Sequence, residues 1–147
     1  MKQEKFLATS RRIMSFSNHR EPKPSDKVVY IDGDFDLFHN GHVRALKEAK
    51  KRGDFLYVGI HDDEIVNKLK GHNNPILSLH ERVLMVLGSK YVDDVLIGAP
   101  YQISEDLLKT FNISLVVQSD ATLTDNDSAT ALCEIDPYKV AKDKGIF

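Results

Sequence analysis

The sequence predicts an α/β fold in which a single domain is built on a Rossmann-like, doubly wound parallel sheet. Apolar, β-branched runs of strand length alternate along the chain with segments of helical spacing. Because parallel strands need crossover connections, this alternation indicates a parallel sheet with helices on both faces. The chain has 147 residues, of which 41% are hydrophobic, and this suits one domain with one core.

The domain is expected to span residues 28–147. Residues 1–27 form an N-terminal segment with weak helical spacing around Phe6, Ile13 and Met14. This segment closes in EPKPSD, whose prolines and charges are typical of a linker.

The first strand is expected at residues 28–31 (VVYI), and a helix is expected to follow it. Asn40 suits the N-cap position, and Gly53 suits the end of the pattern. Side chains that recur at helical intervals lie between them, at Val43, Leu46, Ala49 and Lys50.

The middle of the chain continues the alternation. A strand is expected at residues 55–60, a helix at 62–69 that ends at Gly71, and a loop at 72–77. Ser78 and Glu81 have the spacing of a capping box, which predicts a helix that runs to Gly88.

The remaining elements complete the sheet and add a last helix. Strands are expected at residues 92–98 and 114–118, with a helix at 105–111 capped by Ser104 between them. The final helix is bracketed by Asp136 as N-cap, Pro137 as first residue and Gly145 as C′ residue.

The segment GDFDLFHNGH, residues 33–42, bridges the first strand and its helix. Free backbone N–H groups and the positive end of the helix dipole at this point make an anion site. Gly33 suits a tight turn, and Gly41 lets a phosphate approach the backbone. The imidazoles of His39 and His42 can donate hydrogen bonds to phosphate oxygens, so the segment indicates a nucleoside triphosphate site.

A His-x-x-His pair can also bind a metal ion. A zinc site would need further ligands, and the single cysteine, Cys133, lies far along the chain with no CxxC partner. The GxxxxGK[ST] and GxGxxG phosphate-binding strings are absent as well. A phosphate site here would therefore be of another type.

Polar segments follow the ends of several expected strands. Ligands of open parallel sheets gather beyond the carboxyl ends of the strands. The motif, His61, residues 99–101 and residues 118–121 all occupy such positions, so we expect them to converge on one cleft.

The residues quoted so far resemble a known family. GDFD followed by HNGH is similar to the GxFDxxHxGH signature of the cytidylyltransferases, within the nucleotidyltransferase superfamily. Lys70 in KLKG, Glu81-Arg82, the YVD of residues 91–93 and the closing DPYKVAKDKGIF resemble later blocks of the ethanolamine-phosphate branch. The chain looks most like the second of two tandem catalytic-type domains, and FLATSRRIMSFSN resembles the linker that precedes it.

The resemblance implies a reaction. In it, a phosphate oxygen of phosphoethanolamine attacks the α-phosphorus of CTP in line, which gives CDP-ethanolamine and pyrophosphate without a covalent intermediate. Mg²⁺ is expected to enter with CTP. The chain departs from the family pattern at Gln118, where histidine is usual, and a glutamine can donate a hydrogen bond but cannot become a cation.

The resemblance also implies site residues. The catalytic residues are His39, His42, Lys70 and Arg82. The phosphoethanolamine site is formed by Tyr101, Asp120 and Tyr138. The CTP site is formed by Gly33, Asp34, Phe35, Asp36, His39, Asn40, Gly41, His42, Lys70, Gln118, Ser119, Asp120 and Ala121.

Four of these residues also have other interpretations. Lys70 can be a solvated helix-end lysine, and Tyr101 an ordinary loop aromatic. Arg82 can form a surface ion pair. Asp36 can orient the motif histidines, carry a magnesium-linked contact or cap the turn after the strand. A primary ammonium favours hydrogen-bond acceptors over aromatic faces alone, and the lack of tryptophan favours ethanolamine over choline.

Other readings of the whole chain remain open. It can be a phosphocholine or glycerol-phosphate cytidylyltransferase, or a CTP-binding, weakly active regulatory or pairing domain. The chain stops at Phe147, before an arginine-led, Ser/Thr-rich block that active members carry. A homodimer, or pairing with a sister catalytic domain, is expected because active members pair across the motif edge.

Composition narrows the possible partners. A net charge of −2 argues against a nucleic-acid partner. No apolar run reaches the roughly 18 residues of a membrane span, and the polar residues 1–12 do not resemble a signal peptide. One cysteine excludes an internal disulfide. These observations favour a cytoplasmic protein.

Overall fold

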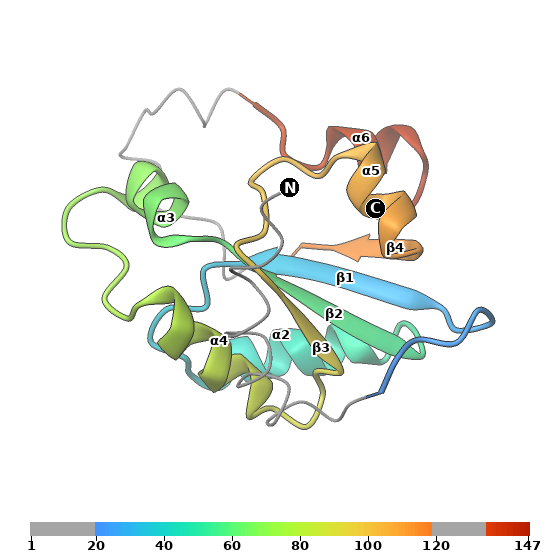
Figure 1. The fold of residues 1–147 in the computed structure, drawn as a ribbon, viewed down its shortest axis with the longest axis horizontal. Coiled ribbons are helices and arrows are strands. Elements are labelled where there is room, and N and C mark those ends of the chain that lie inside the picture. Colours follow the sequence, from blue (N-terminus) through green and yellow to red (C-terminus); the bar gives the residue numbers. More distant parts are fainter. Residues whose placement is uncertain (1–19, 119–134) are drawn as a thin grey trace, which may run out of the picture.

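Four parallel strands form the sheet of the computed structural model, which describes residues 20–118 and 135–147 (Figure 1). The strands are β1 (Val28–Gly33), β2 (Phe55–Ile60), β3 (Asp94–Ile97) and β4 (Ile113–Val117), and their order in the sheet is β3-β2-β1-β4. The predicted α/β fold with a parallel sheet is confirmed.

Strand β1 lies between β2 and β4, and this order positions the site. The chain builds β2 and β3 outward on one side of β1 and then returns to place β4 on the other side. The strand order therefore reverses between β1 and β4, which is where ligands bind in open parallel sheets. In register, Gly33 at the end of β1 is paired with Ile60 at the end of β2, and Ile31 with Val117 at the end of β4.

Helices cover both faces of the sheet (Figure 1). Helices α2 (Asn40–Lys50) and α4 (Leu79–Leu87) lie on one face, and α5 (Glu105–Thr110) and α6 (Lys139–Asp143) lie on the other. Successive residues of a strand point to opposite faces. Val29 and Ile31 accordingly join the core cluster under α2 and α4, whereas Val28 and Tyr30 join the cluster under α5 and α6.

Several helix ends form as their residues predict. The Ser78 and Glu81 side chains make the expected capping box of α4, and Ser104 accepts a hydrogen bond from the Leu107 amide at the start of α5. Helix α3 (Asp63–Lys70) ends at Gly71, whose φ of 69° is open to glycine at little cost. These ends depend on local contacts, which sequence spacing captures.

Several expected boundaries are wrong, and helix α2 ends at Lys50, with Lys51 as its C-cap, instead of at Gly53. The N-cap of α2 is His39, and Asn40 is the first helical residue. The carboxylate of Asp136 caps a turn by accepting from the Tyr138 amide, so α6 begins only at Lys139. Strand β3 is shorter than residues 92–98 because its backbone pairs with β2 only over Asp94–Ile97.

The expected N-terminal segment falls mostly outside the described residues. Residues 1–19 lie there, and the boundary at residue 27 stays a prediction. Arg20 donates hydrogen bonds to the Asp26 carboxylate and to the carbonyl of Asp54, so the end of the segment contacts the domain. No helix within residues 20–118 and 135–147 is long and apolar enough to cross a membrane.

Candidate active site

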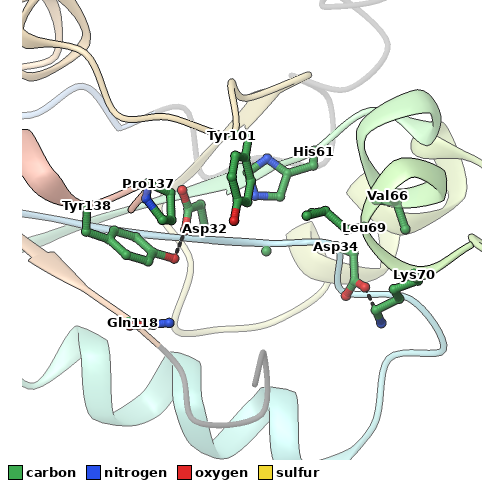
Figure 2. A pocket seen from close by; sticks show the side chains of 11 residues that line it. Asp32, Asp34, His61, Val66, Leu69, Lys70, Tyr101, Gln118, Pro137 and Tyr138 are labelled. Atoms are coloured by element: carbon green, nitrogen blue, oxygen red, sulfur yellow. Dashed lines mark hydrogen bonds and ion pairs between the residues drawn. The ribbon is translucent and has the colours of Figure 1, made fainter. Parts of the chain in front are cut away.

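A pocket opens at the carboxyl edge of the sheet, beside the ends of β1 and β4 (Figure 2). Segments far apart in sequence meet there, as the strand-end pattern predicts. The lining residues are Asp32, Gly33, Asp34, His61, Val66, Leu69, Lys70, Tyr101, Gln118, Pro137 and Tyr138.

One end of the pocket holds a buried carboxylate. Asp32 is only 2% exposed, and its Oδ1 accepts a hydrogen bond of 2.7 Å from the Tyr138 hydroxyl. Its other oxygen, Oδ2, is buried with no hydrogen-bond partner among the described residues. Burial raises the pKa of Asp32 above its ordinary value, and burial and Asp32 together raise that of Tyr138. A buried oxygen of this kind is suited to a cationic ligand, which would offset its desolvation.

Sequence reasoning missed Asp32 as a site residue. A signal was available, because it is a carboxylate inside an otherwise apolar strand, and such residues are rarely buried without a partner. The hydrogen bond to Tyr138 spans 106 residues and has no local pattern.

Two aromatic rings stand beside this carboxylate. The His61 ring places Nδ1 at 2.9 Å from the carbonyl of Ala99, so Nδ1 carries the proton and donates. The Tyr101 ring lies 6.2 Å from the His61 ring, centroid to centroid, and both line the pocket. Figure 2 shows Tyr101 and Tyr138 on either side of Asp32, so the expected Tyr101 and Tyr138 are brought together.

The other end of the pocket holds a lysine. Lys70, the last residue of α3, forms an ion pair with the carboxylate of Asp34 (Figure 2). Burial alone would raise the pKa of Asp34, but the Lys70 ammonium lowers it below its ordinary value. The ammonium is the cation that the pocket offers to an anionic ligand.

The motif histidines cap helix α2 reciprocally. The Gly41 amide donates to His39 Nδ1 at 2.9 Å, and the His39 amide donates to His42 Nδ1 at 3.2 Å. An imidazole nitrogen that accepts must be unprotonated, so each neutral ring carries its proton on Nε2. Burial, followed by the charge of His39, lowers the pKa of His42, which favours this neutral form. Within the described part of the chain, neither Nε2–H makes a hydrogen bond, so both can donate to a phosphate oxygen, although neither ring lines the pocket.

Gly41 is required by the His39 ring. A Cβ at this position would lie 2.7 Å from His39 Cε1, which is closer than real contacts allow. The sequence interpretation assigned Gly41 to phosphate approach, and the structure adds this intramolecular reason.

Asp36 connects the motif to the loop that precedes α4. Its carboxylate accepts hydrogen bonds from the amides of Ile76, at 2.6 Å, and Leu77, at 2.9 Å. It also accepts from the Leu37 amide, which is the expected turn cap. Within residues 20–118 and 135–147 its carboxylate makes no hydrogen bond to the motif histidines, and its negative charge acts to raise the pKa of His42 against the stronger effect of burial.

Arg82 lies in the core instead of on the surface. Its side chain is fully buried, and its guanidinium donates to the carbonyls of Leu77, Asp34 and His61 and to the carboxylate of Asp63. The expected ion pair with a nearby acid is present, but its arginine is buried and only the Asp63 side chain, 53% exposed, reaches the surface. The guanidinium thereby connects the ends of β1 and β2 with helix α3 and the loop before α4. Arg82 does not line the pocket.

The other expected site residues are divided between pocket, core and surface. Gly33 and Gln118 line the pocket, Phe35 is buried in the core, and Asn40 is exposed at the start of α2. Ser119, Asp120 and Ala121 lie outside the described residues. Across residues 20–118 and 135–147, no group of three or more His, Cys, Asp or Glu side chains is arranged to hold a metal ion.

A family model described as cytidylyltransferase-like matches residues 30–140, which include most of this pocket. The chain belongs to that family. The expected family assignment is thus confirmed, and the motif, the parallel sheet and the pocket are features of a cytidylyltransferase-like domain.

Named relatives agree with this family. The chain is 48% identical over 142 residues to an ethanolamine-phosphate cytidylyltransferase of Dictyostelium discoideum, covering 97% of this chain and 38% of that protein. It is 50% identical over 142 residues to the Arabidopsis thaliana protein of the same name, covering 97% and 33%. A mouse choline-phosphate cytidylyltransferase A is more distant, at 36% identity over 121 residues, covering 81% and 31%. The chain spans about a third of the length of these cytidylyltransferase-like relatives.

A solved structure shares the fold. The lipopolysaccharide core biosynthesis protein from Thermoplasma volcanium GSS1 matches with a TM-score of 0.59 and 22% identity, covering 83% of this chain and 91% of that one. At this identity the likeness shows that the two chains share a fold and no more.

Proposed function

We propose that the domain transfers CMP from CTP to phosphoethanolamine, which gives CDP-ethanolamine and pyrophosphate. One observation carries this proposal. A single pocket has the Asp32 carboxylate at one end and the Lys70 ammonium at the other. The carboxylate is buried, and only one of its two oxygens accepts a hydrogen bond from the described residues. Phosphoethanolamine carries the complementary charges, an ammonium and a phosphate, on one small molecule. The names of the relatives support the same choice.

The ammonium of the substrate is assigned to Asp32. Its Oδ2, which has no hydrogen-bond partner among the described residues, is the proposed acceptor. Tyr138 donates to the other carboxylate oxygen, and Tyr101 supplies an aromatic face. Asp120, expected in this site from the sequence, stays a proposal because it lies outside the described residues.

The transfer needs positioning and charge neutralisation more than a nucleophilic side chain. A phosphate oxygen of the substrate attacks the α-phosphorus of CTP, and the bond to pyrophosphate breaks as the new P–O bond forms. The Nε2–H groups of His39 and His42, the N-terminus of α2 and Lys70 are the donors assigned to the developing charge. Gln118, at the end of β4, is assigned to a neutral hydrogen bond with CTP.

Mg²⁺ is proposed to enter with CTP. The described residues form no cluster that would hold a cation by itself. Mg²⁺ is commonly held by substrate phosphates with one or two carboxylates, so the nucleotide would supply most of its ligands.

A binding experiment tests the nucleotide site. His42→Ala and Lys70→Ala should each lower kcat/KM at least about a hundredfold, as expected for lost charge-stabilising donors. CTP affinity measured by calorimetry should also fall. His80→Ala and Lys68→Ala are matched controls, because His80 is exposed and Lys68 pairs with Glu64 on the outer side of α3. Undiminished CTP affinity and turnover in both site variants would remove these residues from the site.

A substrate panel tests the choice of amine. Rates with phosphoethanolamine, phosphocholine and glycerol phosphate should favour phosphoethanolamine, because a primary ammonium can donate hydrogen bonds to Asp32 and a quaternary one cannot. Equal rates with phosphoethanolamine and phosphocholine would refute the assignment, and a preference for glycerol phosphate would establish the third candidate.

A weakly active, CTP-binding domain that pairs with a second domain is the alternative. Two observations favour it: glutamine stands at position 118, and a surface groove between α2 and the end of α4 exposes apolar side chains, Met85 at 47%. Phe38, Val43 and Tyr91 also line this groove, which is proposed to receive a second copy or a sister domain. CTP binding without turnover, together with a dimeric mass, would favour this alternative.

A further inference from the structure

The carboxylate of Asp34 is held firmly at the phosphate end of the pocket. Its side chain is only 15% exposed. Asp34 Oδ1 accepts a hydrogen bond from the Asp36 amide at 3.4 Å. The backbone carbonyl of Asp34 accepts another from Arg82 Nη1 at 2.8 Å. The Asp34 carboxylate is therefore a mostly buried charge, and the backbone of Asp34 is anchored by Arg82.

Lys70 is held more loosely than its partner. It ends α3, its side chain is 34% exposed, and Gly71 follows it with a φ of 69°. Among the residues that the structure describes, its ammonium is held by the ion pair with Asp34. The carboxylate thus determines where the lysine points in the ligand-free pocket.

A phosphate group and the Asp34 carboxylate would compete for one ammonium. A ligand phosphate must either displace the carboxylate from Lys70 or share the ammonium with it. In both cases a mostly buried negative charge remains beside the incoming anion, where solvent screens the repulsion poorly. The lowered pKa of Asp34 keeps this carboxylate ionised at neutral pH.

We propose that Asp34 and Lys70 form a latch across the phosphate end of the pocket. Asp34 acts as a positioning residue that holds Lys70 at the phosphate end of the pocket and weakens the binding of phosphate-bearing ligands until they displace the carboxylate from the ammonium. This refines the sequence interpretation, which counted Asp34 simply among CTP-binding residues. The inference rests on the proposed function only for the identity of the ligand.

Two substitutions of Asp34 test the latch. Asp34→Asn removes the charge and keeps an acceptor for the Asp36 amide, whereas Asp34→Ala removes both. Calorimetry with tripolyphosphate probes the phosphate end alone, and calorimetry with CTP probes the whole site. Both variants should bind both ligands at least about tenfold more tightly than the unmodified chain, because one buried like charge is gone. KM for CTP should fall without a matching fall in kcat.

Glu64→Gln is the matched control. This substitution removes one negative charge and one lysine ion pair from α3, the helix that carries Lys70. Glu64 and Lys68 are both exposed and do not line the pocket. Its affinities should not change. Thermal unfolding of every variant checks that the fold is kept, and a residue with a merely structural role would lower the melting temperature and kcat instead.

The outcomes separate the latch from the proposed function. Tighter tripolyphosphate binding by both Asp34 variants without any CTP binding would support the latch and contradict the CTP assignment. Affinity for both ligands that is unchanged or weaker in the Asp34 variants would overturn the latch, whatever the fate of the CTP assignment.

Discussion

The Tyr138 hydroxyl donates a hydrogen bond of 2.7 Å to the Asp32 carboxylate and leaves the other carboxylate oxygen buried without a partner among the described residues. This contact joins the segment before α6 to the end of β1. One wall of the pocket is therefore made by residues from the start and from the end of the domain sequence. An unsatisfied buried carboxylate oxygen lowers the free energy of unfolding of the protein without ligand. A cationic ligand that donates to it would recover that cost on binding.

Substitution of Asp32 should separate the two substrates. Asp32→Asn keeps the shape of the side chain but removes its charge, and a hydrogen bond to a charged group contributes about 1.5–3 kcal/mol. KM for phosphoethanolamine should therefore rise about tenfold to a hundredfold, whereas CTP affinity should change little. Initial rates and calorimetry measure the two effects. Tyr138→Phe should have a smaller effect in the same direction, and an unaltered phosphoethanolamine KM in both variants would contradict the ammonium assignment.

The same substitution should stabilise the ligand-free protein. Burial raises the pKa of Asp32 in the folded state above its unfolded value, so the folded state binds the proton more tightly. The stability that this group contributes is then present at low pH and is lost as the pH rises through the folded pKa. Asp32→Asn lacks this loss, and its urea midpoint should exceed that of the unmodified chain by more at pH 8 than at pH 4. A difference in urea midpoint that did not change with pH would show that burial does not raise the pKa of Asp32.

The fold followed from the sequence where local spacing decides the structure. The capping box of Ser78 and Glu81 and the helix stop at Gly71 depend on residues a few positions apart, so their patterns predicted them. The N-cap at His39 was missed because the preference for asparagine at caps was outweighed by two imidazole rings that cap each other.

The candidate site was less predictable because its decisive contacts are long-range. Asp32 meets Tyr138 across 106 residues, and Arg82 reaches Asp34 across 48. No periodicity encodes these distances. The motif histidines, Lys70, Tyr101 and Tyr138 were nevertheless named from the sequence through the family resemblance, and of these the structure brings Lys70, Tyr101 and Tyr138 to one pocket.

Gly41→Ala should impair turnover more than stability. Alanine in the first helical turn gains about 0.5–1 kcal/mol over glycine. The new Cβ would lie 2.7 Å from His39 Cε1 and displace the ring from its cap, which costs about 1 kcal/mol. The free energy of unfolding should therefore change by no more than about 1 kcal/mol, while kcat/KM should fall at least about tenfold because the His39 Nε2–H is misplaced. If the Gly41→Ala variant kept the kcat/KM of the unmodified chain, the placement of the His39 ring would have no role in turnover.

The stability of the domain should fall as His42 takes up a proton. In the unfolded chain the imidazole has its ordinary pKa of about 6.5, but burial and His39 lower the pKa in the folded state. The unfolded state therefore binds more protons below about pH 6.5, and the free energy of unfolding decreases from there down to the folded pKa. Protonation also removes the acceptor for the His39 amide.

His42→Gln isolates this contribution. Glutamine at the third helical position can accept the same backbone hydrogen bond and does not titrate in this range. Urea unfolding between pH 7 and pH 5 should show a shallower loss of stability in the variant than in the unmodified chain. An equal loss of unfolding free energy with falling pH in both proteins would mean that the pKa of His42 is the same in the folded and unfolded states.

Arg82 should matter more for stability than a surface arginine does. Its guanidinium is fully buried and donates to three carbonyls, those of Leu77, Asp34 and His61, as well as to the Asp63 carboxylate. A lysine cannot reproduce this planar set of donors, so Arg82→Lys leaves buried acceptors unsatisfied and should destabilise the domain by about 3–5 kcal/mol. Arg44→Lys, at an exposed position of α2, should stay within about 0.5 kcal/mol in the same urea titration. Because Arg82 does not line the pocket, kcat/KM measured well below the unfolding transition should fall only as far as the ends of β1 and β2 shift. A fully stable Arg82→Lys variant without turnover would instead mean that the guanidinium contacts the ligand.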